Sequence, residues 1–551
     1  MAQADSTALF VRKATGLVRS WSVMDAFIYA TFSINLITLG LYIFSQMYFL
    51  QGGLLPTLVI SAIFILFETI TYAALIAVMP RSGGDYVWQS RVLGGGIGFV
   101  LAVTGWWFIL WLWVPLYSDM LRHIVLTPLL GLLGAKDLAL WFGQTPLGLF
   151  VTAVMLCALV TFYIAAGMQS YARIQRWCFW IGLVGLVVVM GLLLAGSPEA
   201  FRAGLEREAP ALFGAPPDVY EATVAAGTEA GATLPLAGGG LTAIFLAMPF
   251  IVFFNLWPNW GATLYGEVRG ATDFKRNLSG MAWALIATTV AAVALALLIA
   301  KSMPWEFYTQ ANAAYWNYTW GYTDQAPPLP IWPYPALLAA FMVPNRLVQI
   351  LIVLAMSAWW FGWSGTVFLS STRVIFAAAF DRLLPEKVAE VEPRTRTPIY
   401  ALLLMVVPSL VVSALFAWDI WGFRSLTLDS TLVIAVTYLG TCIAAVLLPY
   451  RKPDLYNASP IVKYKVLGIP LITVAGLIFG AFLTFLLILW FFDPYINSAA
   501  PLYGIGLQNT NSLIFMGVMY LLALVIYFFF KQRRKQEGID IDKVHQEIPV
   551  E

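Results

Sequence analysis

The chain has 551 residues, of which 60% are hydrophobic and only 11% are charged. A soluble domain usually carries about 25% charged residues, so this composition excludes a soluble globular protein and predicts a protein whose solvent is lipid. The net charge of +2 indicates no class of partner. With only two histidines and three cysteines, we expect no cofactor, no disulfide framework and no histidine-based catalysis, hence no enzyme.

Long apolar runs recur along the whole chain. A membrane-spanning helix needs about 20 such residues, and the absence of period-2 alternation excludes a transmembrane β-barrel. The sequence therefore predicts an all-α polytopic membrane protein with about twelve spans, near residues 21–48, 53–79, 96–118, 147–167, 175–196, 241–266, 279–301, 344–372, 398–418, 429–449, 466–492 and 511–530.

Charge predicts the orientation of these spans. With both termini in the cytoplasm, 24 of the 31 lysine and arginine residues lie on the cytoplasmic side and seven lie outside. Cytoplasmic loops of membrane proteins carry an excess of positive residues. We therefore expect cytoplasmic N- and C-termini in a multi-pass protein of the plasma membrane.

The first span is polar at its middle. Ser33, Asn35 and Thr38 fall near its centre, with Ile34 between them and Gly40 following. A carrier holds its solute where a span is interrupted, because unwound peptide groups are free to bind there. The sequence thus predicts a break at 33–40, although Ser and Thr in a membrane helix often only bond their own preceding carbonyls.

A carboxylate lies in the middle of the second span, at Glu68. An intramembrane acid costs a few kcal/mol unless it is paired or protonated. Two hypotheses remain open: Glu68 takes part in coupling transport to an ion, or it anchors a neighbouring span by a hydrogen bond.

The third span holds four tryptophans within eight residues. Trp106 and Trp113 are seven residues apart and share a helix face, so they could gate or line a pathway, with packing as the alternative.

The sixth span gives the clearest sign of a break. It reads FFNLWPNWG over residues 253–261, and Pro258 removes a backbone donor. A simple proline kink is the alternative, but asparagine in lipid needs a polar role. The residues that we expect to bind substrate here are Phe253, Asn255, Trp257 and Asn259. Free N–H groups of a half-helix would bind an α-carboxylate, and free carbonyls an α-ammonium.

The eighth span is rich in hydroxyls. Ser364 and Thr366 could ligate a sodium ion together with carbonyls of a broken first span, although helix packing explains most such residues. The coupling ion, H⁺ or Na⁺, stays open, and we predict no metal ligand beyond this possibility.

Three cytoplasmic motifs carry a family resemblance. Residues 79–91 read MPRSGGDYVWQSR after the second span, residues 266–270 read GEVRG after the sixth, and residues 371–385 read STRVIFAAAFDRLLP at the end of the eighth. In order and spacing they resemble the motifs of the amino acid–polyamine–organocation (APC) superfamily of permeases. The chain departs from that pattern in span 1, which lacks the glycine-rich break, and in span 5, which lacks a lysine that serves proton coupling in some relatives.

The resemblance implies a leucine-transporter-type core, with two inverted five-span repeats and two further C-terminal helices. Spans 1–5 then form the repeat 21–196 and spans 6–10 the repeat 241–450. The remaining segments are a cytoplasmic N-terminus 1–20, an extracellular loop 197–240, spans 11–12 at 451–530 and a cytoplasmic tail 531–551.

The resemblance also implies a secondary active transporter of amino acids or related small amines, with its site between broken spans 1 and 6. Its partners are then a small-molecule substrate and the lipid bilayer, with no role for nucleic acid. Two alternatives stay open, namely a non-transporting solute sensor of the same fold and a carrier for another organic solute.

Overall fold

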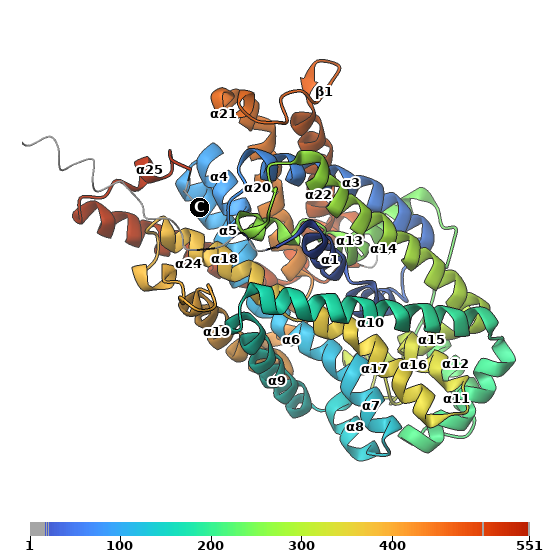
Figure 1. Ribbon diagram of the computed structural model, residues 1–551. Coiled ribbons are helices and arrows are strands. Elements are labelled where there is room, and N and C mark those ends of the chain that lie inside the picture. The colour runs from blue at the N-terminus through green and yellow to red at the C-terminus, as the bar shows by residue number, and fades with distance from the viewer. Residues whose placement is uncertain (1–16, 18, 20, 499–500, 549–551) are drawn as a thin grey trace, which may run out of the picture.

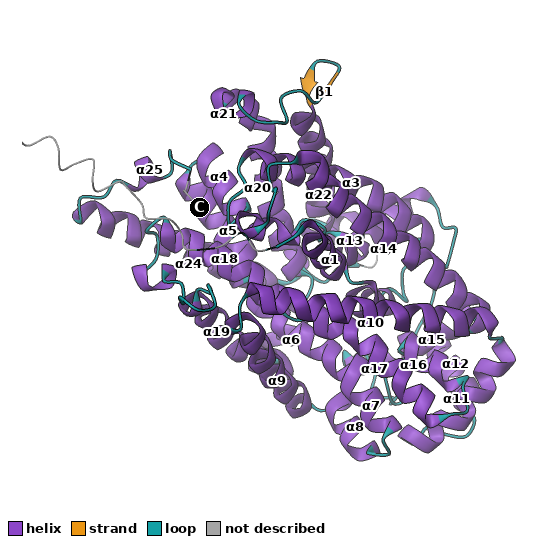
Figure 2. Ribbon diagram, in the orientation of Figure 1, coloured by secondary structure: helices purple, strands orange, loops and turns teal. Residues whose placement is uncertain are grey.

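The computed structural model describes residues 17, 19, 21–498 and 501–548. The predicted N-terminal segment 1–20 therefore lies outside the described residues except at Leu17 and Arg19, as do the last three residues of the predicted tail 531–551. Almost every described element is a helix, and the one sheet found in this part of the chain is a hairpin of β1 (Lys465–Val466) and β2 (Ile469–Pro470) (Figure 2).

Twelve of the described segments are long and apolar enough to cross a membrane, which confirms the predicted architecture. Four of these spans, the first, third, sixth and eighth, consist of several helical pieces. The spans are built from α1 (Val23–Ile34), η2 (Leu36–Gly40) and α2 (Leu41–Gln46); α3 (Leu54–Val78); α5 (Gly95–Val103), η3 (Thr104–Phe108), α6 (Leu110–Leu121), η4 (Arg122–Leu126) and α7 (Thr127–Leu132); α9 (Pro146–Ala165); α10 (Met168–Ala195); α13 (Leu241–Asn255) and η5 (Trp260–Glu267); α14 (Phe274–Ser302); α17 (Arg346–Trp363) and α18 (Thr366–Phe380); α19 (Ile399–Ala417); α20 (Asp429–Arg451); α22 (Leu471–Phe491); and α24 (Thr510–Gln536).

Several spans are longer than predicted. Span 3 continues from the predicted end at 118 to Leu132, span 5 begins at Met168 rather than 175, and span 12 runs on from 530 to Gln536. The physical reason is the same in each place. Charged residues end an apolar run, but backbone hydrogen bonds continue past them because the helix itself does not require apolar side chains.

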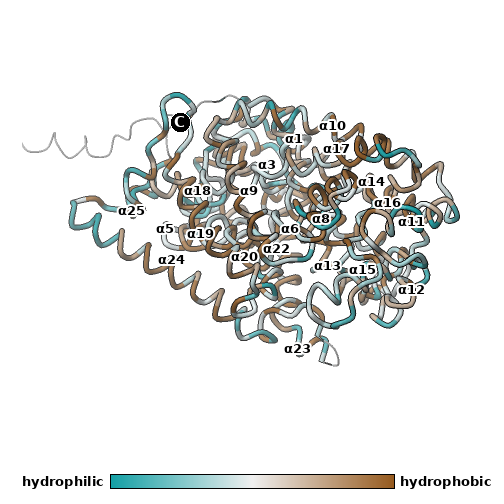
Figure 3. Tube along the Cα trace, turned by 90° about the horizontal axis from the view of Figure 1, so that it is seen from below, coloured by the Kyte–Doolittle hydropathy of each residue, from teal (hydrophilic) through white to brown (hydrophobic). Residues whose placement is uncertain are grey.

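Spans that are distant in sequence pack side by side. Helix α14 packs against both α1 and α3, whereas α6, α9 and α19 pack against one another, and α10 packs along α17. Hydrophobic residues follow the spans, and hydrophilic residues gather at α25 (Ile541–Val544) and around α11 (Pro198–Phe213) and α12 (Val219–Glu229) (Figure 3). Spans 1 and 6 are in contact with each other, through α1 and η5 and through α2 and α13.

The two long polar connections are folded. The first contains α11 (Pro198–Phe213) and α12 (Val219–Glu229), and the second contains α15 (Trp305–Thr319) and α16 (Pro335–Phe341). Tyr220 of α12 stacks on Phe307 of α15 with ring centroids 4.7 Å apart. With α8 (Lys136–Gln144) they gather at one end of the bundle, called here the α12 end (Figure 1).

The opposite end, called here the α25 end, carries α4 (Asp85–Val92), α21 (Pro453–Asn457), the β hairpin and the C-terminal segment (Figure 1). Arg91 of α4 forms a buried ion pair with Asp381 at 2.5 Å. The tail after α24 folds back onto this pair, since the His545 ring lies 3.2 Å from the Tyr86 hydroxyl and Arg91 donates to the Glu547 carbonyl at 3.1 Å. The shorter elements of the chain are η6 (Glu386–Ala389), η7 (Ile420–Leu426), α23 (Asp493–Ile496) and η8 (Gly506–Gln508).

Candidate functional site

The helix of span 1 is interrupted at Asn35, inside the predicted segment 33–40. Asn35 has φ 33° and ψ 84°, a left-handed conformation that asparagine tolerates better than most residues. Its side-chain oxygen accepts the Thr38 N–H at 3.2 Å, and its amide donates to the Trp359 carbonyl at 3.1 Å. One side chain thus caps the following π-helical turn η2 and ties the break to span 8.

Span 6 is interrupted as well. Helix α13 ends at Asn255, the chain is non-helical around Trp257 and Pro258, and a 3₁₀ helix starts at Trp260. Proline explains the stop, since it lacks a backbone donor and clashes with the preceding turn. The two breaks touch, because a Cβ on Gly40 would lie 2.9 Å from the Phe254 ring. Both interruptions are where the sequence predicts them.

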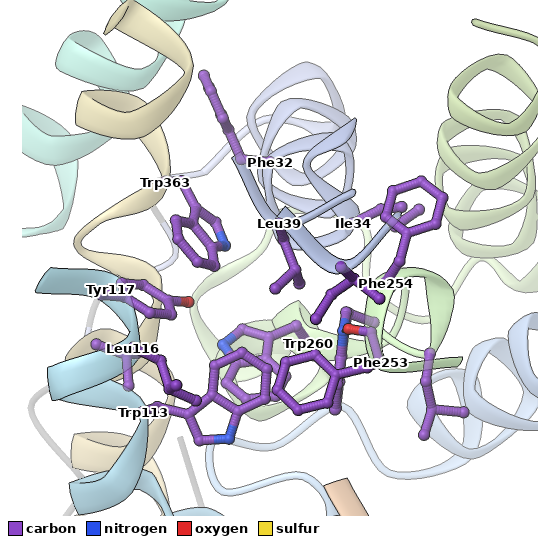
Figure 4. Close-up of a cluster of buried hydrophobic side chains, with 14 of the residues drawn as sticks. Phe32, Ile34, Leu39, Trp113, Leu116, Tyr117, Phe253, Phe254, Trp260 and Trp363 are labelled. Carbon is purple, nitrogen blue, oxygen red and sulfur yellow. The ribbon is translucent and has the colours of Figure 1, made fainter. Parts of the chain in front are cut away.

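A small buried cavity lies beside the two breaks. Its walls are mostly aromatic, and Trp113, Tyr117, Trp260 and Trp363 are among the rings that Figure 4 shows. About 170 Å³ of empty space is divided among gaps that are too narrow for a water-sized sphere, so the site is closed in this conformation. The lining residues are Ser33, Trp113, Tyr117, Trp257, Trp260, Trp363 and Thr366.

The aromatic rings of the cavity brace one another. Trp113 and Trp257 meet edge to face with centroids 5.2 Å apart, as do Trp257 and Trp260 at 5.3 Å, while Tyr117 stacks on Trp363 at 3.5 Å. The Tyr117 hydroxyl lies 3.0 Å from the Thr366 hydroxyl. The cavity thus joins spans 1, 3, 6 and 8.

Toward the α12 end, Phe253 separates the cavity from a wider vestibule. Its ring stacks on Trp113 at 5.1 Å, and its other side lines the vestibule together with Tyr48 and Tyr322. Toward the α25 end, Glu267 and Arg373 form a buried ion pair at 2.8 Å between spans 6 and 8. The described structure is therefore more open on the α12 side.

Glu68 lies on the far side of the span 6 break. Its carboxylate approaches the backbone N–H of Asn259, yet neither oxygen completes a hydrogen bond with a described residue. Both polar atoms of the Asn259 side chain and the Tyr438 hydroxyl also lack a partner in this part of the chain. Buried polar atoms without partners destabilise a fold, so the break brings together groups that cost stability.

A second buried carboxylate lies at the start of α4. Asp85 accepts hydrogen bonds from Tyr72 at 2.6 Å, Trp106 at 3.0 Å and Thr441 at 2.5 Å. Burial raises the pKa of the Asp85 carboxyl to about 6, although the hydrogen bonds from Thr441 and Tyr72 oppose this rise. Asp85 therefore titrates closer to neutral pH than an ordinary carboxyl.

The structure brings some of the predicted residues together and separates others. Ser33, Trp113, Trp257 and Thr366 share the cavity. The remaining span 1 and span 6 residues are buried around the two breaks: Ile34, Asn35, Thr38, Gly40, Phe253, Asn255 and Asn259.

Three predicted residues lie apart from the cavity wall. Trp106 packs behind Trp260 with centroids 4.7 Å apart and bonds Asp85. Ser364 bonds the Phe361 carbonyl at 3.1 Å, and Glu68 faces Asn259 instead.

Sequence reasoning missed Tyr117, Trp260 and Trp363. Each had a signal: Tyr117 follows Trp113 by one helical turn, Trp260 follows the proline break, and Trp363 precedes Ser364.

Twelve apolar helices, two of them broken at mid-length beside a closed cavity, define a polytopic membrane protein of the carrier class. Residues 24–528 match the amino acid permease family, so the chain belongs to that family. This confirms the APC resemblance and indicates a membrane transporter rather than an enzyme. No curated protein matches the chain.

Proposed function

We propose that this protein is a secondary active transporter that moves small amino compounds across the plasma membrane by alternating access. The substrate binds between the breaks of spans 1 and 6, in the cavity lined by Trp113 and Trp257. Both termini lie in the cytoplasm, so the α12 end is extracellular and the α25 end is cytoplasmic.

The observation that carries the proposal is the contact between the two interrupted spans. A helix break at membrane depth leaves backbone groups without partners, which is tolerated where they line a binding site. Both breaks border one closed cavity, where Ser33 of span 1 and Trp257 of span 6 share the wall. A kink that served packing alone would not need a matching interruption in the neighbouring span.

Alternating access requires that one side open as the other closes. The vestibule above Phe253 is a path from outside. On the cytoplasmic side, release requires separation of Glu267 from Arg373, and also of Tyr29 from Ser370, whose hydroxyls lie 2.8 Å apart. Both contacts join the broken spans to span 8, so they act as the inner gate.

Coupling to protons is favoured over coupling to sodium by the polar contacts. The Thr366 hydroxyl is engaged with Tyr117, and Ser364 bonds its own helix, so the two do not form a paired sodium site here. Glu68 by contrast is buried against the break, where its carboxylate approaches the Asn259 N–H without completing a hydrogen bond. We propose Glu68 as the group that carries the proton.

The test is uptake by the purified protein in liposomes. A mixed pool of radiolabelled amino acids and amines is offered with an imposed pH gradient, with a sodium gradient, and with neither; protein-free liposomes are the control. We expect accumulation of at least one solute, driven by the pH gradient. Saturable binding without uptake of any solute would instead indicate a sensor, and uptake restricted to solutes without an amino group would indicate a different carrier.

A further inference from the structure

The chemistry of the cavity narrows the class of substrate, and this inference rests on the transport function proposed above. We propose that the site selects an organic ammonium group that has no carboxylate on the neighbouring carbon. Such a substrate is either a simple amine or an amino acid whose carboxylate is several bonds away.

The first support is the cavity wall. Five of its seven lining residues are aromatic, and none of the described lining residues is charged. The face of an indole or phenol ring is electronegative and attracts a cation, and the attraction is strongest where water is excluded. Trp113, Trp257 and Trp260 are at most 3% exposed, so an ammonium here would meet desolvated rings.

The second support is the direction of the broken helices. The C-terminal turn of α1 contributes Ser33 to the wall, and α13 also ends at the break. Helix C-termini carry unpaired carbonyls and a partial negative charge, which favours a cation.

The third support concerns the groups that would bind an α-carboxylate. A half-helix N-terminus binds anions through its N–H groups. At η2, however, the Thr38 N–H is capped by the Asn35 side chain, and at the break before η5 the Asn259 N–H faces the Glu68 carboxylate. The chain itself thus places oxygens where the carboxylate of an α-amino acid was expected to bind.

The charged residues behind the aromatic wall also disfavour binding of a carboxylate. Asp85 bonds Trp106, whose ring packs behind that of Trp260. Glu68 lies near Tyr438, whose ring is 6.5 Å from that of Trp257. The arginine on the inner side, Arg373, is paired with Glu267. Among these groups no unpaired cation therefore offsets the charge of a bound carboxylate.

The test uses n-propylamine and two isomeric amino acids, 4-aminobutanoate and 2-aminobutanoate, each of which is n-propylamine with a carboxylate added. Their binding to the purified protein in detergent is measured by calorimetry, and their uptake is measured in liposomes. We expect n-propylamine and 4-aminobutanoate to bind at least tenfold more tightly than 2-aminobutanoate. The last differs from 4-aminobutanoate only in the position of its ammonium group.

Variants test whether the aromatic wall provides the selectivity. Trp257→Leu should weaken binding of n-propylamine at least fivefold, whereas Trp257→Phe, which keeps an aromatic face, should retain most of it. Trp180→Leu is the matched control, because Trp180 is 55% exposed on α10. Equal affinities of the Leu and Phe variants, once both are shown to be folded by their melting temperatures, would refute the cation site.

The outcomes also separate this inference from the transport proposal. If 2-aminobutanoate or another α-amino acid is taken up better than both other probes, the protein is a transporter but the selectivity is wrong. If no solute of the mixed pool is taken up, the transport proposal fails, and the inference fails with it.

Discussion

Glu68 and Asn259 show how single residues define the site. Each is polar and fully buried, and neither side chain has a hydrogen-bond partner among the described residues. Asn35 is the contrasting case, since both ends of its side chain are bonded and its positive φ sets the break. Asn35 thus maintains the geometry, whereas Glu68 and Asn259 are available for function.

The first prediction concerns Glu68→Gln. If Glu68 carries the coupling proton, an imposed pH gradient should no longer drive accumulation, because glutamine cannot exchange a proton. Uptake by the variant should fall to the level of wild type without a gradient, while exchange of solute across the membrane continues. Glu306→Gln, at an exposed position on α15, is the control. Unchanged gradient-driven accumulation by Glu68→Gln would make Glu68 structural.

The second prediction concerns the pH dependence of stability at Asp85. Its carboxyl has a pKa near 6 in the fold and an ordinary value of 3.8. The folded state therefore binds a proton that the unfolded chain has lost, and the stability contributed by that proton falls as the pH rises from about 4 to about 6.

In Asp85→Asn this dependence is absent, because asparagine does not titrate. Its side-chain oxygen can accept from Trp106, and its amide can donate to the hydroxyls of Tyr72 and Thr441. We expect both proteins to melt alike at pH 4, and the variant to be more stable at pH 7 by on the order of 3 kcal/mol. Melting curves in detergent at several pH values measure this difference. A difference that does not change with pH would contradict the assigned titration.

At the scale of elements, the breaks are stable because neighbouring helices support them. Span 1 is bonded to span 8 through Asn35 and Trp359, and span 6 is bonded to span 2 through Asn255 and Ser61 at 2.7 Å. A broken helix in lipid has to satisfy its backbone groups through such neighbours. The interrupted elements are therefore products of the bundle and not of local sequence alone.

The third prediction concerns the packing of α11 on α16. A Cβ at Gly204 would lie 2.5 Å from the Phe341 carbonyl oxygen, which belongs to backbone and cannot rotate away. Gly204→Ala should lower the free energy of unfolding by about 1–3 kcal/mol, as overpacking does.

The control for Gly204 is Gly191→Ala on α10. Nothing lies within 4 Å of a Cβ at Gly191, so that variant should gain the helix preference of alanine, about 1 kcal/mol. Limited proteolysis measures the change in stability of the α11 and α12 region in each variant. Equal resistance of the two variants would show that α11 is not held by this contact.

At the scale of the whole molecule, the α12 and α25 ends differ in structure and in charge. The α12 end carries the helical connections with acidic residues such as Glu229, whereas the α25 end carries the basic end of α24 and the tail. The positive-inside rule assigns the basic end to the cytoplasm.

The fourth prediction is the labelling of single cysteines. Glu229→Cys lies at an exposed position on α12, and Leu467→Cys lies at the tip of the β hairpin, where the native side chain is 98% exposed. In intact cells an impermeant maleimide should label the first and not the second, which should react only after permeabilisation. The unmodified chain is the control for the native cysteines, of which Cys157 and Cys442 are buried and Cys178 is partly buried. The reverse pattern would overturn the orientation.

The class of the fold and the regions of the two breaks follow from the order of residues along the chain. Apolar runs longer than a bilayer permit only spanning helices, Pro258 lacks a backbone donor, and asparagine tolerates the left-handed conformation that Asn35 adopts. These properties are local, so they can be read in order along the chain. The family motifs after spans 2, 6 and 8 are also short runs of consecutive residues, so they too can be read from the sequence.

Which side chains meet depends on how the helices pack in three dimensions. Hydropathy does not distinguish Trp113 and Trp363, which line the cavity, from Trp180, which is exposed on α10, because all three lie in apolar runs. The lengths of spans 3, 5 and 12 were also missed, since helical hydrogen bonding continues past charged residues. The approach of Glu68 to Asn259 and the bond of Trp106 to Asp85 join residues of different helices. Such pairs depend on how twelve helices pack, and no pattern within one helix specifies them.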